Sequence, residues 1–112
     1  MSLLQQHLDA AASGALKPVL DCLRNSSNGR DYYPKVDLGA GLIRIKQKGA
    51  FLGIFSKRVL TISISNAFDI TGYRVEDGRF TNSRELPELL QHTELRQPLG
   101  NVYLTVSGLR DY

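Results

Sequence analysis

Residues 42–48 and 59–65 alternate apolar and polar side chains with a period of two. The apolar positions are Ile43, Ile45, Leu60, Ile62 and Ile64, and the polar positions are Arg44, Lys46, Lys48, Thr61, Ser63 and Ser65. Successive side chains of a β-strand point to opposite faces of a sheet. The pattern therefore predicts a sheet with one apolar face and one polar face, and the apolar face needs helices to cover it.

The first part of the chain has the apolar spacing of helices. Two sets of residues recur every three or four positions, namely Leu4, Leu8, Ala11 and Ala12, and then Leu16, Val19, Leu20 and Leu23. Ser13-Gly14 fits a break between two short helices, and Pro18 fits the first turn of the second. One kinked helix through Leu23 is the alternative. In either form the apolar side of the helix needs a sheet to cover it.

Further strands are expected after the helical region. Residues 30–41 contain Pro and several Gly and are predicted to form a connecting loop, which is followed by the strands at 42–48 and 59–65. A third strand is expected at residues 70–75. The Asp77-Gly78 pair then favours a tight hairpin turn, which leads to a short strand at residues 79–81.

The last third of the chain is expected to add one short helix and one strand. Asn82 or Ser83 is the predicted cap of the helix, and Pro87 lies in its first turn. Its buried residues are expected to be Leu86, Leu89 and Leu90. A final strand is predicted at residues 102–106. The chain is therefore expected to be one α+β domain over residues 1–112, with one or two N-terminal helices and a later short helix on one face of a mostly antiparallel sheet of about five strands.

Positive charge is concentrated on one segment. Residues 38–68 form a run of 31 residues without a carboxylate. The run carries Arg44, Lys46, Lys48, Lys57 and Arg58. Removing these five charges from the overall net charge of +3 leaves −2 for the rest of the chain. The concentration predicts a basic sheet face and an acidic partner, and the alternative is a solvated face that protects the sheet from aggregation.

Residues with catalytic or metal-binding chemistry are sparse and scattered. Cys22 lies on a predicted helix close to the apolar residues Val19 and Leu23. Apolar neighbours favour a packed thiol over a nucleophile. His7 and His92 are isolated on different predicted helices, and two His with one Cys do not make a recognisable zinc site. The sequence has no dinucleotide-binding or phosphate-loop glycine motif. We therefore expect a protein that is not an enzyme and holds no metal or cofactor.

The compartment is predicted from the N-terminus and from cysteine usage. The N-terminus lacks the basic start of a signal peptide, and no run of about 18 apolar residues is long enough to span a membrane. The single cysteine cannot form an internal disulfide, which fits a reducing compartment. We expect a cytoplasmic protein without a transmembrane segment.

An apolar stretch inside the basic segment adds candidate contact residues. It contains Phe51 and Phe55 and is flanked by Lys48, Lys57 and Arg58. Aromatic side chains among basic residues stack on nucleic-acid bases or anchor protein interfaces. They also cover the end of a core. The sequence leaves open whether this stretch extends the hairpin or forms an exposed tip.

These features favour a small non-enzymatic protein–protein interaction module. By analogy of size and class, it would be a bacterial or phage protein that neutralises a partner, as immunity proteins, antitoxins and anti-defence inhibitors do. The expected partner is a protein with an acidic surface, bound by the sheet face and loops. The candidate contact residues are Tyr32, Tyr33, Arg44, Lys46, Lys48, Phe51, Phe55, Lys57 and Arg58.

Two other functions remain open at this stage. The first is binding of single-stranded nucleic acid by the basic strand at residues 42–48 and the nearby aromatic residues. The second is a small-molecule-binding or enzymatic pocket with Tyr73, Tyr103 or His92 as polar groups. A homodimer formed through an edge strand is compatible with each of them.

Overall fold

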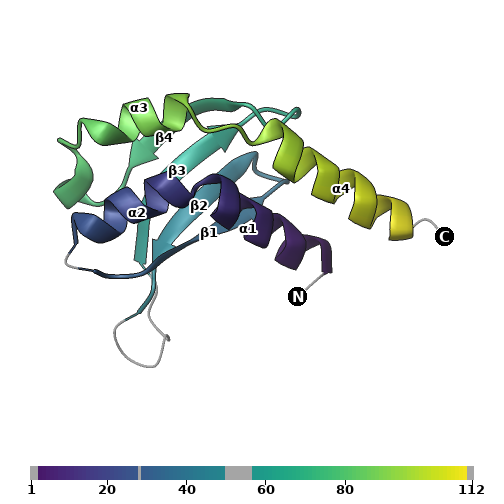
Figure 1. Cartoon of the computed structure of the whole chain (residues 1–112), viewed down its shortest axis with the longest axis horizontal. Helices are drawn as coiled ribbons and strands as arrows, with labels where there is room; N and C mark the ends of the chain where they lie inside the picture. Colours follow the sequence, from purple (N-terminus) through teal and green to yellow (C-terminus); the bar gives the residue numbers. More distant parts are fainter. Residues whose placement is uncertain (1–2, 28, 50–56, 111–112) are drawn as a thin grey trace.

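The computed structural model describes residues 3–27, 29–49 and 57–110. Its elements in chain order are α1 (Leu3–Ala15), α2 (Lys17–Asn25), β1 (Tyr32–Asp37), β2 (Leu42–Gln47), β3 (Lys57–Ile64), β4 (Ile70–Val75), the 3₁₀ helix η1 (Gly78–Phe80), α3 (Glu85–Gln91) and α4 (Arg96–Arg110). Within these residues, four strands form one antiparallel sheet in the order β1-β2-β3-β4. The helices lie together on one face of the sheet (Figure 1). The predicted α+β class is confirmed, with four strands in place of about five.

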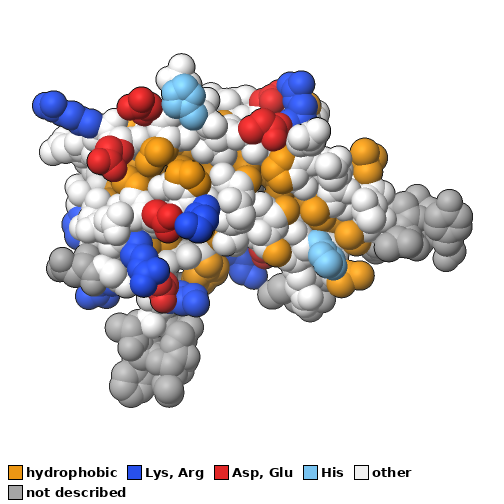
Figure 2. All heavy atoms as spheres, viewed as in Figure 1, with side chains coloured by type: hydrophobic (Ala, Val, Ile, Leu, Met, Phe, Trp, Pro, Cys, Tyr) orange, Lys and Arg blue, Asp and Glu red, His pale blue; other side chains and the backbone are white. Residues whose placement is uncertain are grey.

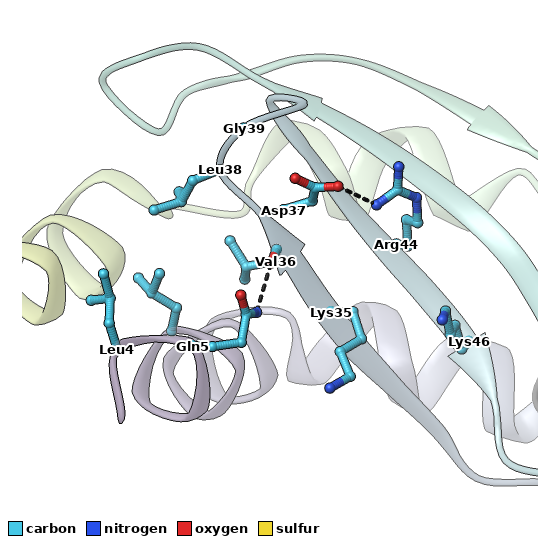
Figure 3. A pocket seen from close by; sticks show the side chains of 10 residues that line it. Leu4, Gln5, Lys35, Val36, Asp37, Leu38, Gly39, Arg44 and Lys46 are labelled. Atoms are coloured by element: carbon cyan, nitrogen blue, oxygen red, sulfur yellow. Dashed lines mark hydrogen bonds and ion pairs between the residues drawn. The ribbon is translucent and has the colours of Figure 1, made fainter. Parts of the chain in front are cut away.

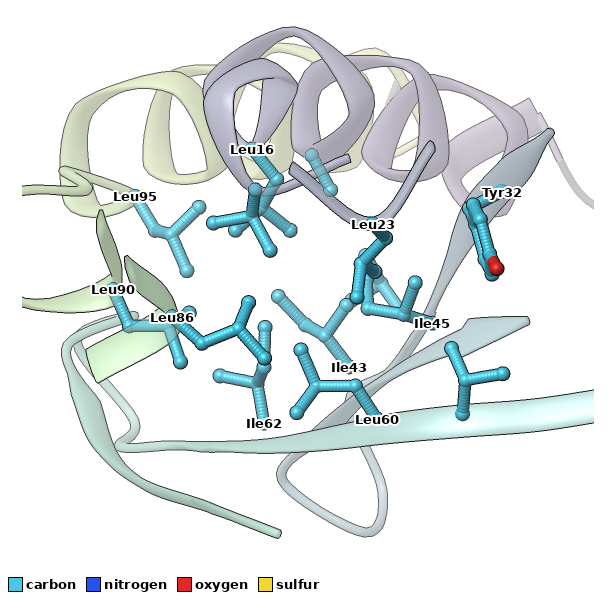
Figure 4. Packing of buried hydrophobic residues seen from close by; sticks show 14 of the residues in the cluster. Leu16, Leu23, Tyr32, Ile43, Ile45, Leu60, Ile62, Leu86, Leu90 and Leu95 are labelled. Atoms are coloured by element: carbon cyan, nitrogen blue, oxygen red, sulfur yellow. The ribbon is translucent and has the colours of Figure 1, made fainter. Parts of the chain in front are cut away.

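The core lies between the sheet and the helices, as Figure 4 shows. The inward side chains of β2 and β3 have no exposed surface, as the alternation predicts; they are Ile43, Ile45, Leu60 and Ile62. They pack beneath Leu16 and Leu23 from the N-terminal helical region and Leu86 and Leu90 from α3. Full burial of an aliphatic side chain contributes about 1.5–3 kcal/mol, so this layer is the main source of stability.

The N-terminal region forms two helices, which is one of the two predicted forms. The break falls at Leu16, two residues beyond the predicted Ser13-Gly14 position, and Leu16 is fully buried. Pro18 lies in the first turn of α2, where an N–H has no helical partner to lose. The prediction for Pro18 is therefore confirmed.

The predicted loop at residues 30–41 is wrong, because its central part forms the edge strand β1. Tyr33 lies opposite Lys46 of β2 in an antiparallel register. Pro34 is tolerated because β1 has a neighbour on only one side, so the missing N–H breaks no ladder bond. The turn into β2 contains Gly41 at a φ of 67°, which glycine adopts readily. The proline and the glycines are typical of loops, and they hid the buried and half-buried alternation of the strand.

The predicted final strand at residues 102–106 is also wrong, because these residues belong to α4. Leu95, Leu99, Val102 and Val106 recur at helical spacing, and Leu99 is fully buried. Within residues 102–106 alone, the apolar alternation fits a strand equally well. The longer helical pattern decides the structure because it gives α4 a continuous apolar side toward the core.

The short strand predicted at residues 79–81 is replaced by η1. Asp77 caps this 3₁₀ turn, since its Oδ1 accepts a hydrogen bond from the N–H of Arg79 at 3.0 Å. Capping by an Asp side chain satisfies a backbone donor that the turn leaves free. The chain therefore turns back toward the helices instead of pairing with β4.

The predicted short helix is present as α3, but its predicted caps are wrong. The residue before α3 is Arg84, and no side chain forms a capping hydrogen bond there, so neither Asn82 nor Ser83 acts as the cap. Pro87 lies in the first turn, as predicted. Leu86 and Leu90 are buried, and Leu89 is half-buried against the same core.

The first and last helices pack against each other, which ties the two ends of the chain together (Figure 1). We predict that Leu99→Ala on α4 lowers the free energy of unfolding by about 3 kcal/mol, because this side chain is fully buried. The matched control is Leu104→Ala on the same helix. Leu104 is 72% exposed, so the control should change the free energy by less than about 0.5 kcal/mol.

Denaturant unfolding followed by circular dichroism measures both variants. Equal losses for Leu99→Ala and Leu104→Ala would contradict the packing of α4 on the core.

Candidate partner-binding face

The sheet face opposite the helices is not covered by any described element, and we call it the open face. Residues that lie opposite each other in a β-ladder project to the same face, so the register defines its members. They are Tyr33, Lys35, Asp37, Leu42, Arg44, Lys46, Arg58, Thr61, Ser63, Gly72 and Arg74, with the carboxylate of Glu76 reaching among them. Five cations and two carboxylates give this face a net charge of +3.

The cross-strand register gathers the basic residues into two adjacent rows. The first row is Tyr33, Lys46 and Arg58, and the second is Lys35, Arg44, Thr61 and Arg74. Neighbouring strands lie about 4.8 Å apart, so the members of each row are close neighbours. The structure thus brings together the predicted residues Tyr33, Arg44, Lys46 and Arg58. It adds Lys35 and Arg74, whose only sequence signal was their alternate position on a strand.

Arg44 is held in place by an ion pair. Its Nη1 donates to Asp37 Oδ2 at 2.7 Å across the β1–β2 turn (Figure 3). The hydrogen bond from Arg44 is the main cause that lowers the pKa of the Asp37 carboxyl from its ordinary value. The Nε of Arg44 is buried and has no hydrogen-bond partner among the described residues. Arg44 therefore contributes to the local structure as well as to the charge of the open face.

Glu76 neutralises part of the charge on the other side of the open face. Its carboxylate pairs with both Arg58 and Arg74 and accepts a hydrogen bond from the Thr61 hydroxyl at 3.2 Å. The hydrogen bond from Arg74 is the main cause that lowers the pKa of Glu76. Two cations share this single carboxylate, so a positive excess remains.

Lys46 lies between these two paired groups. It is half-buried, and no carboxylate lies within ion-pair distance of it in the described part of the chain. Its neighbours across the strands are Tyr33 and Arg58. Lys46 is therefore the cation at the centre of the open face that is available to a carboxylate or phosphate from outside.

Of the other predicted contact residues, Lys48 lies just beyond the end of the open face, and Lys57 and Tyr32 lie away from it. Lys48 is exposed beyond the end of β2, where its N–H donates to the C=O of Asp31 at 3.0 Å. Lys57 lies 3.3 Å from Asp77. Tyr32 is 8% exposed on the helix side of the sheet. The predicted contact residues Phe51 and Phe55 lie outside the described residues. The predicted choice between an exposed tip and an extended hairpin concerns the same stretch and also lies outside the described residues.

Asp77 forms a polar cluster that sequence reasoning missed, since the Asp-Gly pair was interpreted only as turn chemistry. Asp77 is 5% exposed and accepts hydrogen bonds from Arg79 Nη2 at 2.7 Å and Nε at 3.1 Å. Arg79 Nη2 also donates to Gln47 Oε1 at 2.9 Å. The hydrogen bonds from Arg79 are the main cause that holds the pKa of the Asp77 carboxyl well below its ordinary range. The cluster fixes the end of β2 to the turn after β4.

Tyr32 belongs to this structural cluster. Its hydroxyl donates to Gln47 Oε1 at 3.4 Å, and its ring meets Phe80 edge-on with centroids 6.1 Å apart. Edge-to-face aromatic pairs of this kind stabilise cores by about 0.5–1.5 kcal/mol beyond area burial. Tyr32 therefore packs inside the protein, while its neighbour Tyr33 lies on the open face.

The reactive residue types lie apart from one another. The Cys22 thiol is buried, donates to Glu85 Oε2 at 3.3 Å, and has a pKa raised mainly by burial and then by Glu85. His7 is exposed on α1, and His92 is exposed at the residue that follows α3. Among the described residues, no group of three or more His, Cys, Asp or Glu side chains is placed to hold a metal ion, and no helix is long and apolar enough to cross a membrane.

The helix-covered side has a different surface from the open face. Figure 2 shows Lys and Arg side chains interspersed with Asp and Glu there, and apolar side chains gathered toward the end where α1 and α4 lie. The exposed apolar residues of these two helices are Leu3, Tyr103 and Leu104.

Comparison of the chain with protein-family models, curated proteins and solved structures finds no match.

We predict that Asp77→Asn lowers the free energy of unfolding at pH 7 by about 1–3 kcal/mol, because it weakens a buried charge-assisted hydrogen-bond network. The folded-state pKa of Asp77 lies below the unfolded value of about 3.9, so its stabilisation is complete above that pH. It is lost as the pH falls through the folded-state pKa. The difference between wild type and variant should therefore shrink below about pH 4.

Urea unfolding at a series of pH values measures this difference. Asp21→Asn is the control, because Asp21 forms an exposed pair with Lys17 on α2. A loss in Asp77→Asn that stays constant down to pH 2 would contradict the role of the Asp77 carboxylate.

Proposed function

We propose that this chain is a non-enzymatic protein–protein interaction module that binds an acidic protein surface with its open face. The observation that carries the proposal is that Lys46, at the centre of a sheet face of net charge +3, has no ion-pair partner among the described residues, and that no described element covers this face. A complementary potential steers diffusional encounter and suppresses wrong partners. The bound partner would supply the carboxylate that Lys46 lacks.

The proposed contact surface has a centre and a rim. Its centre is the row of Tyr33, Lys46 and Arg58, in which an amphipathic ring lies beside two cations. Tyr and Arg are enriched at interface hot spots. Arg44 and Arg74 form the rim, where their existing pairs with carboxylates reduce the gain from a new contact.

Some of the remaining predicted contact residues stay in this proposal, and others are left out. Lys48 is exposed beside the open face and stays in the proposal as a contact at its end. Phe51 and Phe55 stay as predicted loop contacts. Tyr32 and Lys57 are left out, because Tyr32 packs in the core and Lys57 pairs with the buried Asp77.

The proposed biological class is a small protein that neutralises its partner by occupying its surface. Immunity proteins, antitoxins and anti-defence inhibitors are the classes of small protein that we propose by analogy. The argument is one of size and architecture. The single buried Cys22 thiol fits the reducing cytoplasm that we propose as its compartment.

Binding of single-stranded nucleic acid is the second candidate function. The row of Tyr33, Lys46 and Arg58 supports it, since a base stacks on a tyrosine while adjacent cations pair with phosphates. Salt dependence separates the two candidates. Each phosphate contact to a single strand contributes roughly 0.7 to the log–log slope of affinity against salt, whereas an interface anchored by apolar contacts is much flatter.

We predict that Lys46→Glu reduces capture of the partner at least tenfold and leaves thermal stability nearly unchanged. The substitution reverses the one unpaired charge at the centre of the open face, and removing an interface charge of this kind costs about 2 kcal/mol or more. Arg84→Glu is the matched control. Arg84 is exposed before α3, has no ion pair among the described residues, and gives the same change in net charge.

The measurement is affinity capture from extract of the source cells after nuclease treatment, with wild type and both variants side by side. Equal capture of the partner by Lys46→Glu and wild type would contradict the proposal that the open face binds the partner. Loss of the captured material on nuclease treatment, or a steep salt slope with an oligo-dT probe, would favour the second candidate. Arg44→Glu is a poorer test, because it places two carboxylates together at Asp37.

A further inference from the structure

The first edge of the sheet is protected by helix α1. On β1, the N–H of Val36 donates to Asp9 Oδ1 at 2.8 Å. The C=O of Val36 accepts from Gln5 Nε2 at 2.6 Å, as Figure 3 shows. Pro34, which faces the same way two residues earlier, has no N–H to offer. Lys35 lies 3.6 Å from Asp9 and adds charge at this edge. Proline, charge and covering side chains are the usual devices that prevent strand addition.

The opposite edge, β4, lacks this protection. The N–H of Glu76 donates to the C=O of Val59 at 2.9 Å, which sets the phase of the β3–β4 ladder. Because an antiparallel ladder bonds alternate residues, Arg74 bonds to β3, and the backbone groups of Tyr73 and Val75 point away from it. In the described part of the chain, no other element hydrogen-bonds to the backbone of Tyr73 or Val75. This edge presents free donors and acceptors.

The β4 edge also has a hollow on each of its two faces. The hollow on the helix side, about 420 Å³, lies between β4 and α3, and its apolar lining is Ile70, Tyr73, Pro87 and Leu90. The hollow on the open face, about 450 Å³, is lined by Leu42, Thr61, Ser63, Gly72, Tyr73 and Arg74. Side chains of an added strand would alternate between the two faces. The two hollows are therefore placed to receive alternate side chains of one extended segment.

The two hollows differ in chemistry. The helix-side hollow has a mixed lining of apolar and polar residues, and the one acidic residue at it, Asp69, is already paired with Arg96. The open-face hollow has a mostly apolar lining surface, and its one charged lining residue is Arg74. Arg74 shares the single carboxylate of Glu76 with Arg58, so one positive charge remains in excess at this margin of the open face. Gly72 leaves open space there, since nothing lies within 4 Å of where its Cβ would be. The preference therefore comes from charge: an apolar side chain can contact Ile70, Tyr73 or Leu90 in the first hollow, and a carboxylate at the second would meet the cation in excess at Arg58 and Arg74.

We infer that β4 is a docking edge for an extended segment of the acidic partner, which adds to the sheet as a fifth strand. The segment alternates apolar side chains toward α3 with acidic side chains toward Arg74. Main-chain hydrogen bonds to Tyr73 and Val75 supply affinity, and the two hollows supply selectivity. The acidic chemistry of the segment rests on the proposed function. The free edge of β4 is argued independently, from the hydrogen-bond pattern of the β3–β4 ladder.

A second copy of the chain fits this edge less well. Pairing β4 with another β4 would place two open faces next to each other in one continuous sheet. Each face carries the same net charge of +3, so their cations would repel. Charge complementarity therefore selects an acidic segment as the occupant.

The test uses a capped heptapeptide that alternates glutamate and valine, added to the ¹⁵N-labelled full chain. We expect amide shifts concentrated on β4 and α3. The same peptide with lysine in place of glutamate should bind at least tenfold more weakly. A version with N-methylated inner amides should also bind at least tenfold more weakly, because it cannot donate to the edge while the protein is unchanged.

Two substitutions at one position give the matched protein test. Tyr73→Pro removes both the ring and the outward N–H, and Tyr73→Thr removes the ring alone. Tyr73→Pro should lose at least tenfold in affinity, whereas Tyr73→Thr should stay within about threefold of wild type. Circular dichroism checks folding, and the N-methylated peptide decides the question if Tyr73→Pro does not fold.

Several outcomes would overturn the inference. These are no binding at millimolar peptide, shifts centred on Lys46 instead of β4, equal binding of the N-methylated peptide, or a concentration-dependent dimer that protects the Tyr73 amide from exchange. Failure here is distinguishable from failure of the proposed function. A chain whose partner capture depends on Lys46 but which ignores the peptide keeps the function and loses the docking edge.

Discussion

The sheet has one face that must be removed from water, and helices from both ends of the chain remove it. Ile43, Ile45, Leu60 and Ile62 project from the central strands into this layer and have no exposed surface. The helices stand at the two ends of the sequence, and all of them pack on the same face, as Figure 1 shows. The opposite face consequently has nothing from the described chain to cover it. Because all the described helices pack on one face of the sheet, that face becomes part of the core and the opposite face remains the open face.

The charges of the open face follow the same logic. Most residues of the open face are polar, and five of them are basic; Asp37 pairs with Arg44, and Glu76 pairs with Arg58 and Arg74. Pairing leaves Lys46 in the centre without a carboxylate among the described residues, next to Tyr33. In the function that we propose, the fixed guanidinium groups and Tyr33 would meet a partner of defined geometry.

The sequence allowed prediction of what depends on local periodicity. The strands around Ile43 and Ile62, the paired N-terminal helices and the position of Lys46 on a polar face were all predictable from alternation and helical spacing. What failed depended on context. Pro34 disguised an edge strand whose missing N–H costs nothing only at an edge, and α4 was recognisable only over a window that includes Leu99. Ion pairs such as Arg74 with Glu76, and the asymmetry between the two sheet edges, depend on strand register, which no local pattern specifies.

The contact between α1 and α4 has a consequence for synthesis of the protein. The helix α1 is translated before the whole sheet, and the helix it packs against, α4, is translated only after the sheet. Until α4 is made, Leu8 and its apolar neighbours are incompletely buried, and the unfinished chain exposes apolar surface. Such non-local closure slows folding and gives chaperones and proteases an opportunity to act on unfinished chains.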